Sequence, residues 1–167
     1  KMKKKPEVFI VASAIGWYGD RGDEELTEES EIGKGFLPET CSDWEEASAN
    51  LPDEVRHVYL RSGIVLSGTG GALGKMLLPF KMGAGGPMGN GKQWMSWISL
   101  DDEIYAIHHL LMETGSKGVY NLTAPNPVRQ KGFAKTLGRV LRRPAFAPLP
   151  GFVIKILFGE MGVKLTL

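Results

Sequence analysis

The sequence predicts an α/β domain with a parallel sheet. Short apolar runs, typical of strands buried on both faces, alternate along the chain with segments whose apolar residues recur at helical spacing. Most of these runs end in loops rich in glycine, proline or polar residues, which mark the places where a strand or helix stops. With 167 residues, the chain is long enough for one domain with a moderate core.

Residues 8–20 are the stretch around which we expect the rest of the chain to be organised. An apolar run from Val8 to Ala12 changes abruptly into small residues, glycines and two aromatics. Ligands of open α/β sheets bind outside the carboxyl ends of the strands, so Ser13 and Tyr18 are candidates for contact with a substrate or a nicotinamide. A tight turn whose polar groups satisfy nearby backbone explains the same residues equally well.

The remaining elements follow from the same patterns. In chain order we expect an acidic loop over residues 20–35, a helix over 38–51, a strand from 55 to 66, a helix over 72–82, a glycine-rich loop over 83–91, a strand over 92–100, a helix after 102, a strand over 118–123, a helix around 133–141 and a last apolar helix that begins at Pro150. The helix after residue 102 is expected to carry Ile104, Ile107, His108 and Leu111 on one face. The glycines of residues 68–71 have neither the Gly-x-Gly-x-x-Gly spacing nor the Lys-Ser/Thr of a phosphate loop.

Composition excludes several classes of protein. The net charge is +1, which gives no case for nucleic-acid binding, and no apolar run is long enough to cross a bilayer. The single cysteine, Cys41, excludes an internal disulfide framework and fits a reducing compartment. No signal peptide precedes the first strand, so we expect a cytoplasmic protein, with an organelle as the alternative.

Several motifs together resemble one known family. They are ASAIGWYGD (residues 12–20), WEEA (44–47), LRSGIVL (60–66), GGAL (70–73), LPF (78–80), GGP (85–87), WI (97–98) with DD (101–102), and NLTAPNP (121–127). Each motif is weak by itself, but their combination covers nearly the whole chain. In this combination the sequence resembles the atypical extended short-chain dehydrogenase/reductases, more narrowly the 39U-type, sugar-nucleotide epimerase-like branch.

The resemblance implies a Rossmann-like parallel sheet with a small substrate-side lobe, to which residues 68–97 and 125–167 contribute. It implies NADP or NAD as cofactor, a small-molecule substrate such as a nucleotide sugar, and a homodimer as one expected assembly, without nucleic acid or membrane. In the family, a strand–Gly-x-x-Gly-x-x-Gly–helix unit in the first half seats the cofactor diphosphate. Nothing like it precedes Val8, so we expect this chain to be the carboxyl-terminal part of the domain, and we expect full cofactor binding to require the first half.

The resemblance also assigns site residues. The expected catalytic residues are Ser13 and Tyr18. The cofactor is expected at Ala12, Ser13, Arg61, Ser62, Gly63 and Val65. The substrate is expected at Trp17, Tyr18, Gly85, Gly86, Lys92 and Trp94; no metal site is expected. Arg61 has two interpretations: it either pairs with a ligand carboxylate or phosphate or forms a structural ion pair. Tyr18 departs from the family motif, because it lacks the lysine that active family members have four residues later.

The family's Tyr-x-x-x-Lys pair falls on Leu37 and Cys41, which are both apolar, so the usual proton-transfer apparatus is at most partial. Cys41 is either a nucleophile or, the better interpretation, a packing thiol. Three functions therefore stay open: an NAD(P)-dependent oxidoreductase or epimerase-like enzyme, a binding protein that holds NADP(H) or a nucleotide sugar without turnover, and an inactive half-domain that associates with itself.

Overall fold

The computed structural model describes residues 4–149, and these fall into two compact units. The first unit contains the chain up to Gly63 together with residues 100–123, and the second contains residues 64–99 and the chain from Ala124 onward. Each unit is described by itself below. The apolar helix expected from Pro150 lies outside the described residues.

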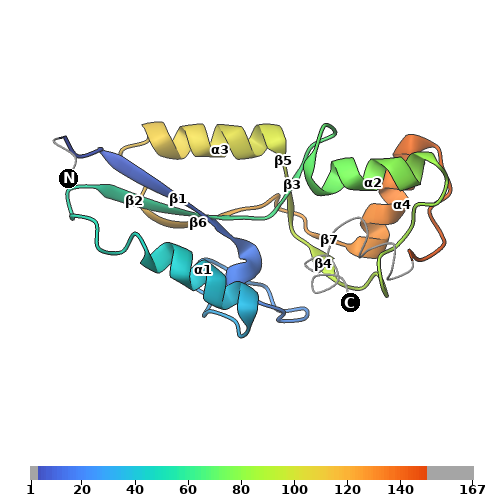
Figure 1. Ribbon diagram of the computed structural model, residues 1–167, viewed down its shortest axis with the longest axis horizontal. Coiled ribbons are helices and arrows are strands. Elements are labelled where there is room, and N and C mark those ends of the chain that lie inside the picture. Colours follow the sequence, from blue (N-terminus) through green and yellow to red (C-terminus); the bar gives the residue numbers. More distant parts are fainter. Residues whose placement is uncertain (1–3, 150–167) are drawn as a thin grey trace. The chain divides into compact units, whose positions relative to one another are not determined.

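The first unit is built on a three-stranded parallel sheet. Its strands are β1 (Val8–Ala14), β2 (Arg56–Ser62) and β6 (Gly118–Leu122), in the order β1-β2-β6. Helix α1 (Phe36–Glu46) lies along one face and helix α3 (Leu100–Met112) along the other (Figure 1). Because both faces are covered, the middle strand is apolar throughout its centre, and Val58 and Leu60 are 0% and 4% exposed. The α/β class with a parallel sheet is thus confirmed.

One expectation about the helices of this unit is wrong, and the burial of another helix could not be read from its periodicity. Helix α1 ends at Glu46 instead of Leu51, and the hydroxyl of Ser48 donates to the Glu45 carbonyl at 2.9 Å in the turns that follow. Such side-chain bonds compete with the helical ladder. Helix α3 buries Glu103 and Leu110, while Ile104 and Leu111 of the expected face are 53% and 46% exposed.

The orientation of α3 is fixed at both ends by polar contacts that helical periodicity does not report. Near its start, Ser62 at the end of β2 donates to the Glu103 carboxylate at 2.6 Å. At its end, the guanidinium of Arg56 donates to the carbonyls of Leu110 and Leu111 at 2.7 and 2.8 Å and to that of Ser116 at 2.9 Å. These carbonyls have no helical partner, so Arg56 acts as a carboxyl-terminal cap.

The second unit contains two small sheets and two helices. Strand β3 (Ile64–Leu66) pairs in parallel with β5 (Trp97–Ser99), and β4 (Trp94–Met95) pairs antiparallel with β7 (Val128–Arg129). Helices α2 (Gly71–Lys81) and α4 (Gln130–Leu141) pack around a hydrophobic core. Its buried residues are Met76, Phe80, Met88, Ala134 and Leu149. Helix α2 lies close to its expected place.

Two expected strands are each divided between sheets. Residues 55–66 form β2 and β3, which separate at Gly63 and belong to different sheets, and residues 92–100 form β4 and β5. The amide of Gly63 donates to Leu122, whereas the next amide, of Ile64, donates to Ser96. The change of partner follows Arg61, Ser62 and Gly63, which interrupt the apolar pattern, so this glycine was an available signal for the end of β2.

Candidate functional site

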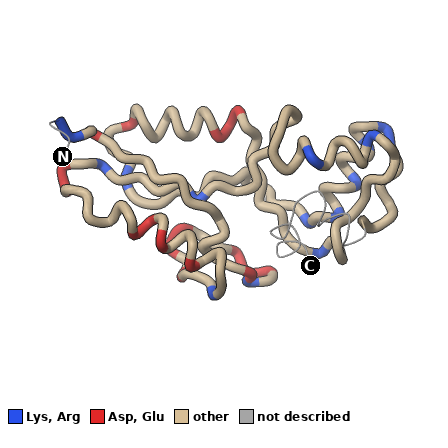
Figure 2. The backbone as a smooth tube through the Cα atoms, in the orientation of Figure 1, with Lys and Arg blue, Asp and Glu red and all other residues tan. Residues whose placement is uncertain are grey.

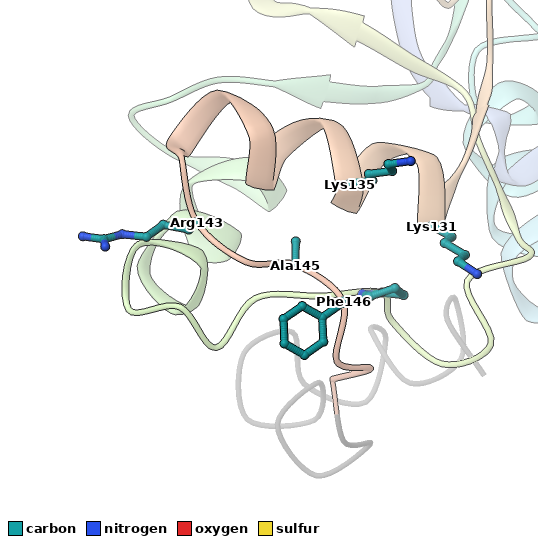
Figure 3. A pocket seen from close by; sticks show the side chains of 6 residues that line it. Lys131, Lys135, Arg143, Ala145 and Phe146 are labelled. Atoms are coloured by element: carbon teal, nitrogen blue, oxygen red, sulfur yellow. The ribbon is translucent and has the colours of Figure 1, made fainter.

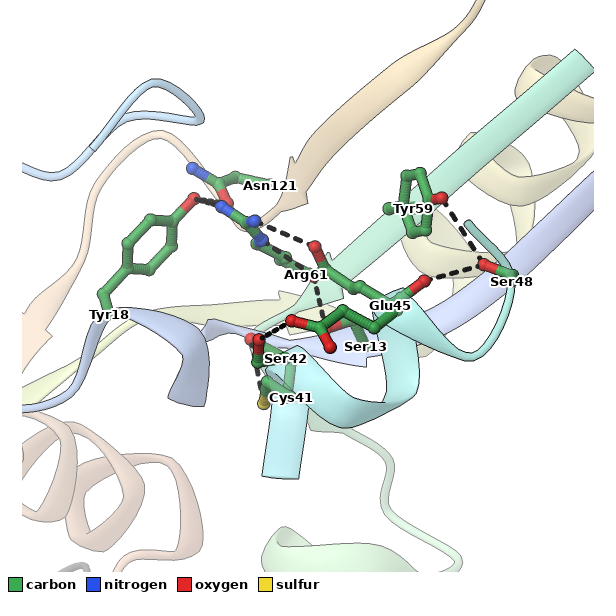
Figure 4. A network of polar contacts seen from close by, with 11 residues as sticks. Ser13, Tyr18, Cys41, Ser42, Glu45, Ser48, Tyr59, Arg61 and Asn121 are labelled. Carbon is green, nitrogen blue, oxygen red and sulfur yellow. Dashed lines mark hydrogen bonds and ion pairs between the residues drawn. The ribbon is translucent and has the colours of Figure 1, made fainter. Parts of the chain in front are cut away.

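The site is built on one row of residues across the first unit's sheet. In the parallel register, Ser13 of β1 lies opposite Arg61 of β2, and Arg61 lies opposite Asn121 of β6. Residues in register point to the same face of a sheet. Tyr18, in the short 3-10 helix η1 (Ile15–Tyr18), and Glu45 of α1 approach this row (Figure 4).

These five side chains form a continuous hydrogen-bonded network around Arg61. Its Nε and Nη2 donate to the two carboxylate oxygens of Glu45, both at 3.0 Å, in the bidentate arrangement that guanidinium favours. Ser13 donates to the same carboxylate at 2.7 Å. The remaining nitrogen, Nη1, donates to the Tyr18 hydroxyl at 3.1 Å, and this hydroxyl donates to Asn121 Oδ1 at 2.6 Å.

Aromatic rings enclose the guanidinium. Its central carbon lies 3.8 Å from the centroid of the Trp17 ring and 5.2 Å from that of Tyr18, within the range of cation–π attraction. Arg61 and Tyr18 are each 3% exposed and Ser13 is 7% exposed. Burial by itself lowers the pKa of Arg61, but its hydrogen bonds to Glu45 and Tyr18 raise the pKa overall, so the group stays charged. Of the two interpretations of Arg61, the structural ion pair is the one found.

The geometry limits what the two expected catalytic hydroxyls can do. The Ser13 hydroxyl donates its hydrogen bond to Glu45, and the Tyr18 hydroxyl donates its own to Asn121. In this arrangement each hydroxyl can only accept a hydrogen bond from a ligand. Their catalytic roles remain predictions. Their place in a common network at the carboxyl end of the sheet is established.

Helix α1 carries apolar groups where the family resemblance expects tyrosine and lysine. Cys41 is 3% exposed, and its thiol lies 3.7 Å from the Ala14 carbonyl oxygen. Desolvation by burial raises the pKa of this thiol, which keeps it protonated and unreactive at neutral pH. This environment is that of a packing thiol.

The remaining expected site residues are distributed over both units. Ala12, Trp17, Ser62 and Gly63 belong to the first unit; Val65, Gly85, Gly86, Lys92 and Trp94 belong to the second. Ligand contacts of these residues remain predictions.

Packing within the second unit explains the identity of two of these glycines. A Cβ atom on Gly85 would lie 2.3 Å from the Phe80 ring, and one on Gly86 would lie 1.8 Å from the Ala147 carbonyl oxygen. Another of the expected residues, Trp94, is 44% exposed, and the centroid of its ring lies 3.9 Å from the central carbon of the Arg129 guanidinium.

Two residues of the site, Glu45 and Asn121, were not identified from the sequence. Glu45 lies off the apolar stripe of its helix, which is typical of a solvent-facing residue, and Asn121 lies within a strand pattern. The one available signal was Arg61 itself, because an arginine in an inner strand needs a carboxylate partner. Within residues 4–149, no group of three or more metal-ligating side chains is found.

Comparison with known proteins gives close relatives over nearly the whole chain. No family model matches it. The epimerase family protein SDR39U1 homologue of Arabidopsis thaliana, named as chloroplastic, is 44% identical over 93% of this chain and 45% of its own length. Epimerase family protein YfhF of Bacillus subtilis is 41% identical over 99% of this chain and 55% of its own. The crystal structure of human epimerase family protein SDR39U1 with NADPH superposes with a TM-score of 0.89 at 36% identity, covering 99% of this chain and 57% of that one.

The chain is similar to members of this epimerase family over nearly its whole length. The resemblance to the atypical extended short-chain dehydrogenase/reductases, and with it the Rossmann-like fold, is confirmed. The chain spans about half the length of the curated relatives it matches. A more distant structure, UDP-glucose 4-epimerase of Thermus thermophilus with NAD, has a TM-score of 0.67 at 18% identity and supports the fold alone.

The assembly of the protein and its location in the cell remain predictions. Among residues 4–149, no helix is both long and apolar enough to traverse a bilayer. The expected homodimer and the expected substrate class remain predictions.

Proposed function

We propose that this chain forms the nicotinamide end and the substrate side of an NAD(P)-dependent oxidoreductase or epimerase-like protein. The observation that carries the proposal is the likeness, at 36% identity over 99% of the chain, to a human family member whose crystal structure contains NADPH. The parallel sheet supports it, because the carboxyl ends of its strands are where ligands bind in such folds.

Three buried side-chain atoms in the described part of the first unit have no hydrogen-bond partner, His57 Nε2 among them, and two of the three fit such a ligand. The indole Nε1 of Trp17 and the Oε2 of Glu103 are buried and have no hydrogen-bond partner among the described residues. Buried polar atoms are nearly always paired, so each is a candidate contact for a polar ligand group: one a donor, the other an acceptor. Glu103 is held by Ser62, which is itself an expected cofactor residue.

In this proposal the protein mainly binds and orients. A bound nicotinamide cofactor supplies hydride transfer. The backbone at Ala12, Ser13 and residues 61–65 lines the space for the nicotinamide, and the Arg61–Glu45 pair fixes the ends of β1 and β2 relative to α1. Ser13 can accept one hydrogen bond from a ligand while its own proton stays on Glu45.

A second function is favoured by a separate observation. Both expected catalytic hydroxyls are buried and donate within the protein, and α1 carries Leu37 and Cys41 where an acid/base pair would be needed. This arrangement suits a protein that holds NADP(H) or a nucleotide sugar without turnover, since ligand binding needs no proton transfer.

Amide NMR spectroscopy with added NADPH, on a protein that also carries the family's amino-terminal half with its diphosphate seat, tests the shared part of both functions. We expect shifts at Ala12, Ser13, Ser62 and Gly63 and at the Trp17 indole N–H. Because the Glu103 carboxylate is a proposed ligand contact, Glu103→Gln should weaken the binding of NADPH. Absence of shifts, or shifts confined to other residues, would refute the proposed site.

Cofactor turnover separates the two functions. For an enzyme, NADPH oxidation in the presence of a panel of nucleotide sugars and carbonyl compounds should fall in Tyr18→Phe but not in Tyr105→Phe, a matched control because Tyr105 is 72% exposed on α3. A binding protein shows NADPH shifts and no oxidation with any compound. Unchanged oxidation in both Ser13→Ala and Tyr18→Phe would show that these hydroxyls take no part in the chemistry.

A further inference from the structure

Charged residues are unevenly divided between the two units. In the second unit, Lys131, Lys135 and Arg143 border a hollow beside α4, but their charged ends point in different directions around it (Figure 3). The described residues of that unit contain no Asp or Glu. In the first unit, Figure 2 shows carboxylates in red along the acidic loop over residues 20–35, which follows η1. This loop makes contact with the site described above.

The acidic loop is closed at its base. The Gly33 amide donates to the Trp17 carbonyl at 2.9 Å, so the chain returns to the end of η1. The approach is so close that a Cβ on Gly33 would lie 2.2 Å from the Tyr18 carbonyl oxygen. Within the loop, Arg21 pairs with Glu24 at 2.7 Å. A compact surface loop whose ends meet is an Ω-loop, a type that is frequently functional.

The tip of the loop reaches the far edge of the sheet. The loop leaves the sheet after β1, whereas the Glu28 carboxylate accepts the main-chain amide of Asn121, in β6, at 2.8 Å. Because the strand order is β1-β2-β6, the loop spans the width of the sheet at its carboxyl end. The next residue, Leu122, gives its carbonyl to Gly63, so the main-chain groups of Asn121 point the other way, to the open edge of β6.

Asn121 connects this bond to the site. Its Oδ1 accepts the Tyr18 hydroxyl at 2.6 Å, and the same hydroxyl accepts Arg61 Nη1 at 3.1 Å (Figure 4). The Asn121 acceptor therefore fixes the direction in which the Tyr18 proton points. One residue of β6 is held by the loop through its main chain and holds the site through its side chain.

We propose that Glu28 is a positioning residue of the site, which sets the direction of the Tyr18 hydroxyl by holding the main chain of Asn121. A bond from an amide to a carboxylate is charge-assisted and stronger than one to a neutral acceptor. Without it, the open edge of β6 loses its partner at the residue that carries the Tyr18 acceptor. The inference deepens the proposed function and rests on it for the catalytic role of Tyr18, whereas the bonds themselves need no ligand.

Fluorine NMR of protein labelled with 3-fluorotyrosine tests the proposal without cofactor. The chain is used together with the family's amino-terminal half, and Tyr18→Phe assigns the Tyr18 resonance. A fluorine beside the hydroxyl reports its hydrogen bond, so Glu28→Ala should shift the Tyr18 resonance and not that of the exposed Tyr105. Glu28→Gln should keep the parent position, because its amide oxygen still accepts the Asn121 amide. The matched control is Glu25→Ala, an exposed carboxylate of the same loop, which should cause no shift.

Hydrogen exchange and a double variant separate the two steps. In Glu28→Ala the Asn121 amide should exchange at least about ten-fold faster, the factor that corresponds to one lost bond to a charged acceptor. Asn121→Ala should itself shift the Tyr18 resonance, and adding Glu28→Ala should cause no further shift. This non-additivity is expected only if Glu28 acts through Asn121.

Several results would overturn the proposal. These are an unchanged Tyr18 resonance or unchanged Asn121 exchange in Glu28→Ala, an equal shift in Glu25→Ala, or a further shift in the double variant. A shift in Glu28→Gln as large as in Glu28→Ala would assign the effect to the charge of the loop instead of to this bond. Circular dichroism of each variant excludes a change of fold as the cause. Since NADPH is absent, failure here leaves the proposed cofactor site standing, and failure of that site leaves these bonds standing.

Discussion

Replacing Glu45 by Gln would remove the one carboxylate that neutralises the buried Arg61. The substitution keeps the size of the side chain and its capacity to accept one hydrogen bond, so packing is little changed. What is lost is the charge between Ser13 and the guanidinium, together with one of the two bonds to Arg61. The Arg61 charge then stays in the interior with only neutral partners, which are the remaining amide oxygen, the Tyr18 hydroxyl and the aromatic rings.

The expected cost follows from the burial of the pair. The side chains of Arg61 and Glu45 are 4% and 11% exposed, so solvent screens their interaction weakly. Breaking such a pair by removing one partner typically costs about 3–5 kcal/mol in the free energy of unfolding. With urea slopes of about 1–3 kcal/mol per molar, the midpoint of urea unfolding should fall by at least about 1 M.

Urea unfolding followed by circular dichroism measures this cost, and a double-mutant cycle identifies its source. Because most of the penalty is the uncompensated charge, Glu45→Gln/Arg61→Met should be more stable than Glu45→Gln alone. The control is Glu24→Gln, since Glu24 pairs with Arg21 at 2.7 Å but its side chain is 48% exposed. Such exposed pairs contribute about 1 kcal/mol or less.

A loss of less than about 1 kcal/mol in Glu45→Gln would refute this reasoning, because it would place the pair in the class of surface salt bridges. A double variant less stable than Glu45→Gln would also contradict it. Arg61 would then contribute by packing against Trp17 and Tyr18 more than by its charge.

Three further predictions concern stability and reactivity. Arg56→Gln should lower the free energy of unfolding by about 2–3 kcal/mol in urea, because three bonds from a charged donor are lost, two to the end of α3 and one to the Ser116 carbonyl; no change would mean that water replaces the cap. The Cys41 thiol should react with a disulfide reagent at neutral pH much more slowly in the native protein than in urea, since burial raises its pKa; equal rates would contradict this. Within α4, Gly138→Ala should be destabilising, because its Cβ would lie 2.5 Å from that of Ala145. Gly132→Ala, which meets nothing within 4 Å, should gain about 0.5–1 kcal/mol in thermal unfolding, and the same sign for both would be inconsistent with the packing at Gly138.

Much of the fold could be predicted because strands buried on both faces carry a local signal. The first strand, expected from Val8, and the strand ending at Leu122 appear where the apolar runs place them. The motifs that carry the family resemblance are likewise contiguous in the sequence, so a single chain suffices to identify them. Cys41 was correctly interpreted as a packing thiol from its place in an apolar stripe.

The parts of the site that could not be predicted depend on partners distant in the chain. Arg61 meets Glu45 sixteen residues earlier, and Tyr18 meets Asn121 across 103 positions. Periodicity reports which residues of an element turn the same way, but not which face is buried, as α3 shows by burying Glu103 instead of Ile104. That choice is made by the elements packed against it.

The amino-acid order by itself determined the alternation of strands and helices and the polar residues at the ends of β1 and β2. These are local properties, because each depends on neighbours along the chain. Only the tertiary structure decided that Ser13, Arg61 and Asn121 share one row and that Glu45 neutralises Arg61. Strand register and backbone packing set these relations, and neither is written in any single stretch of residues.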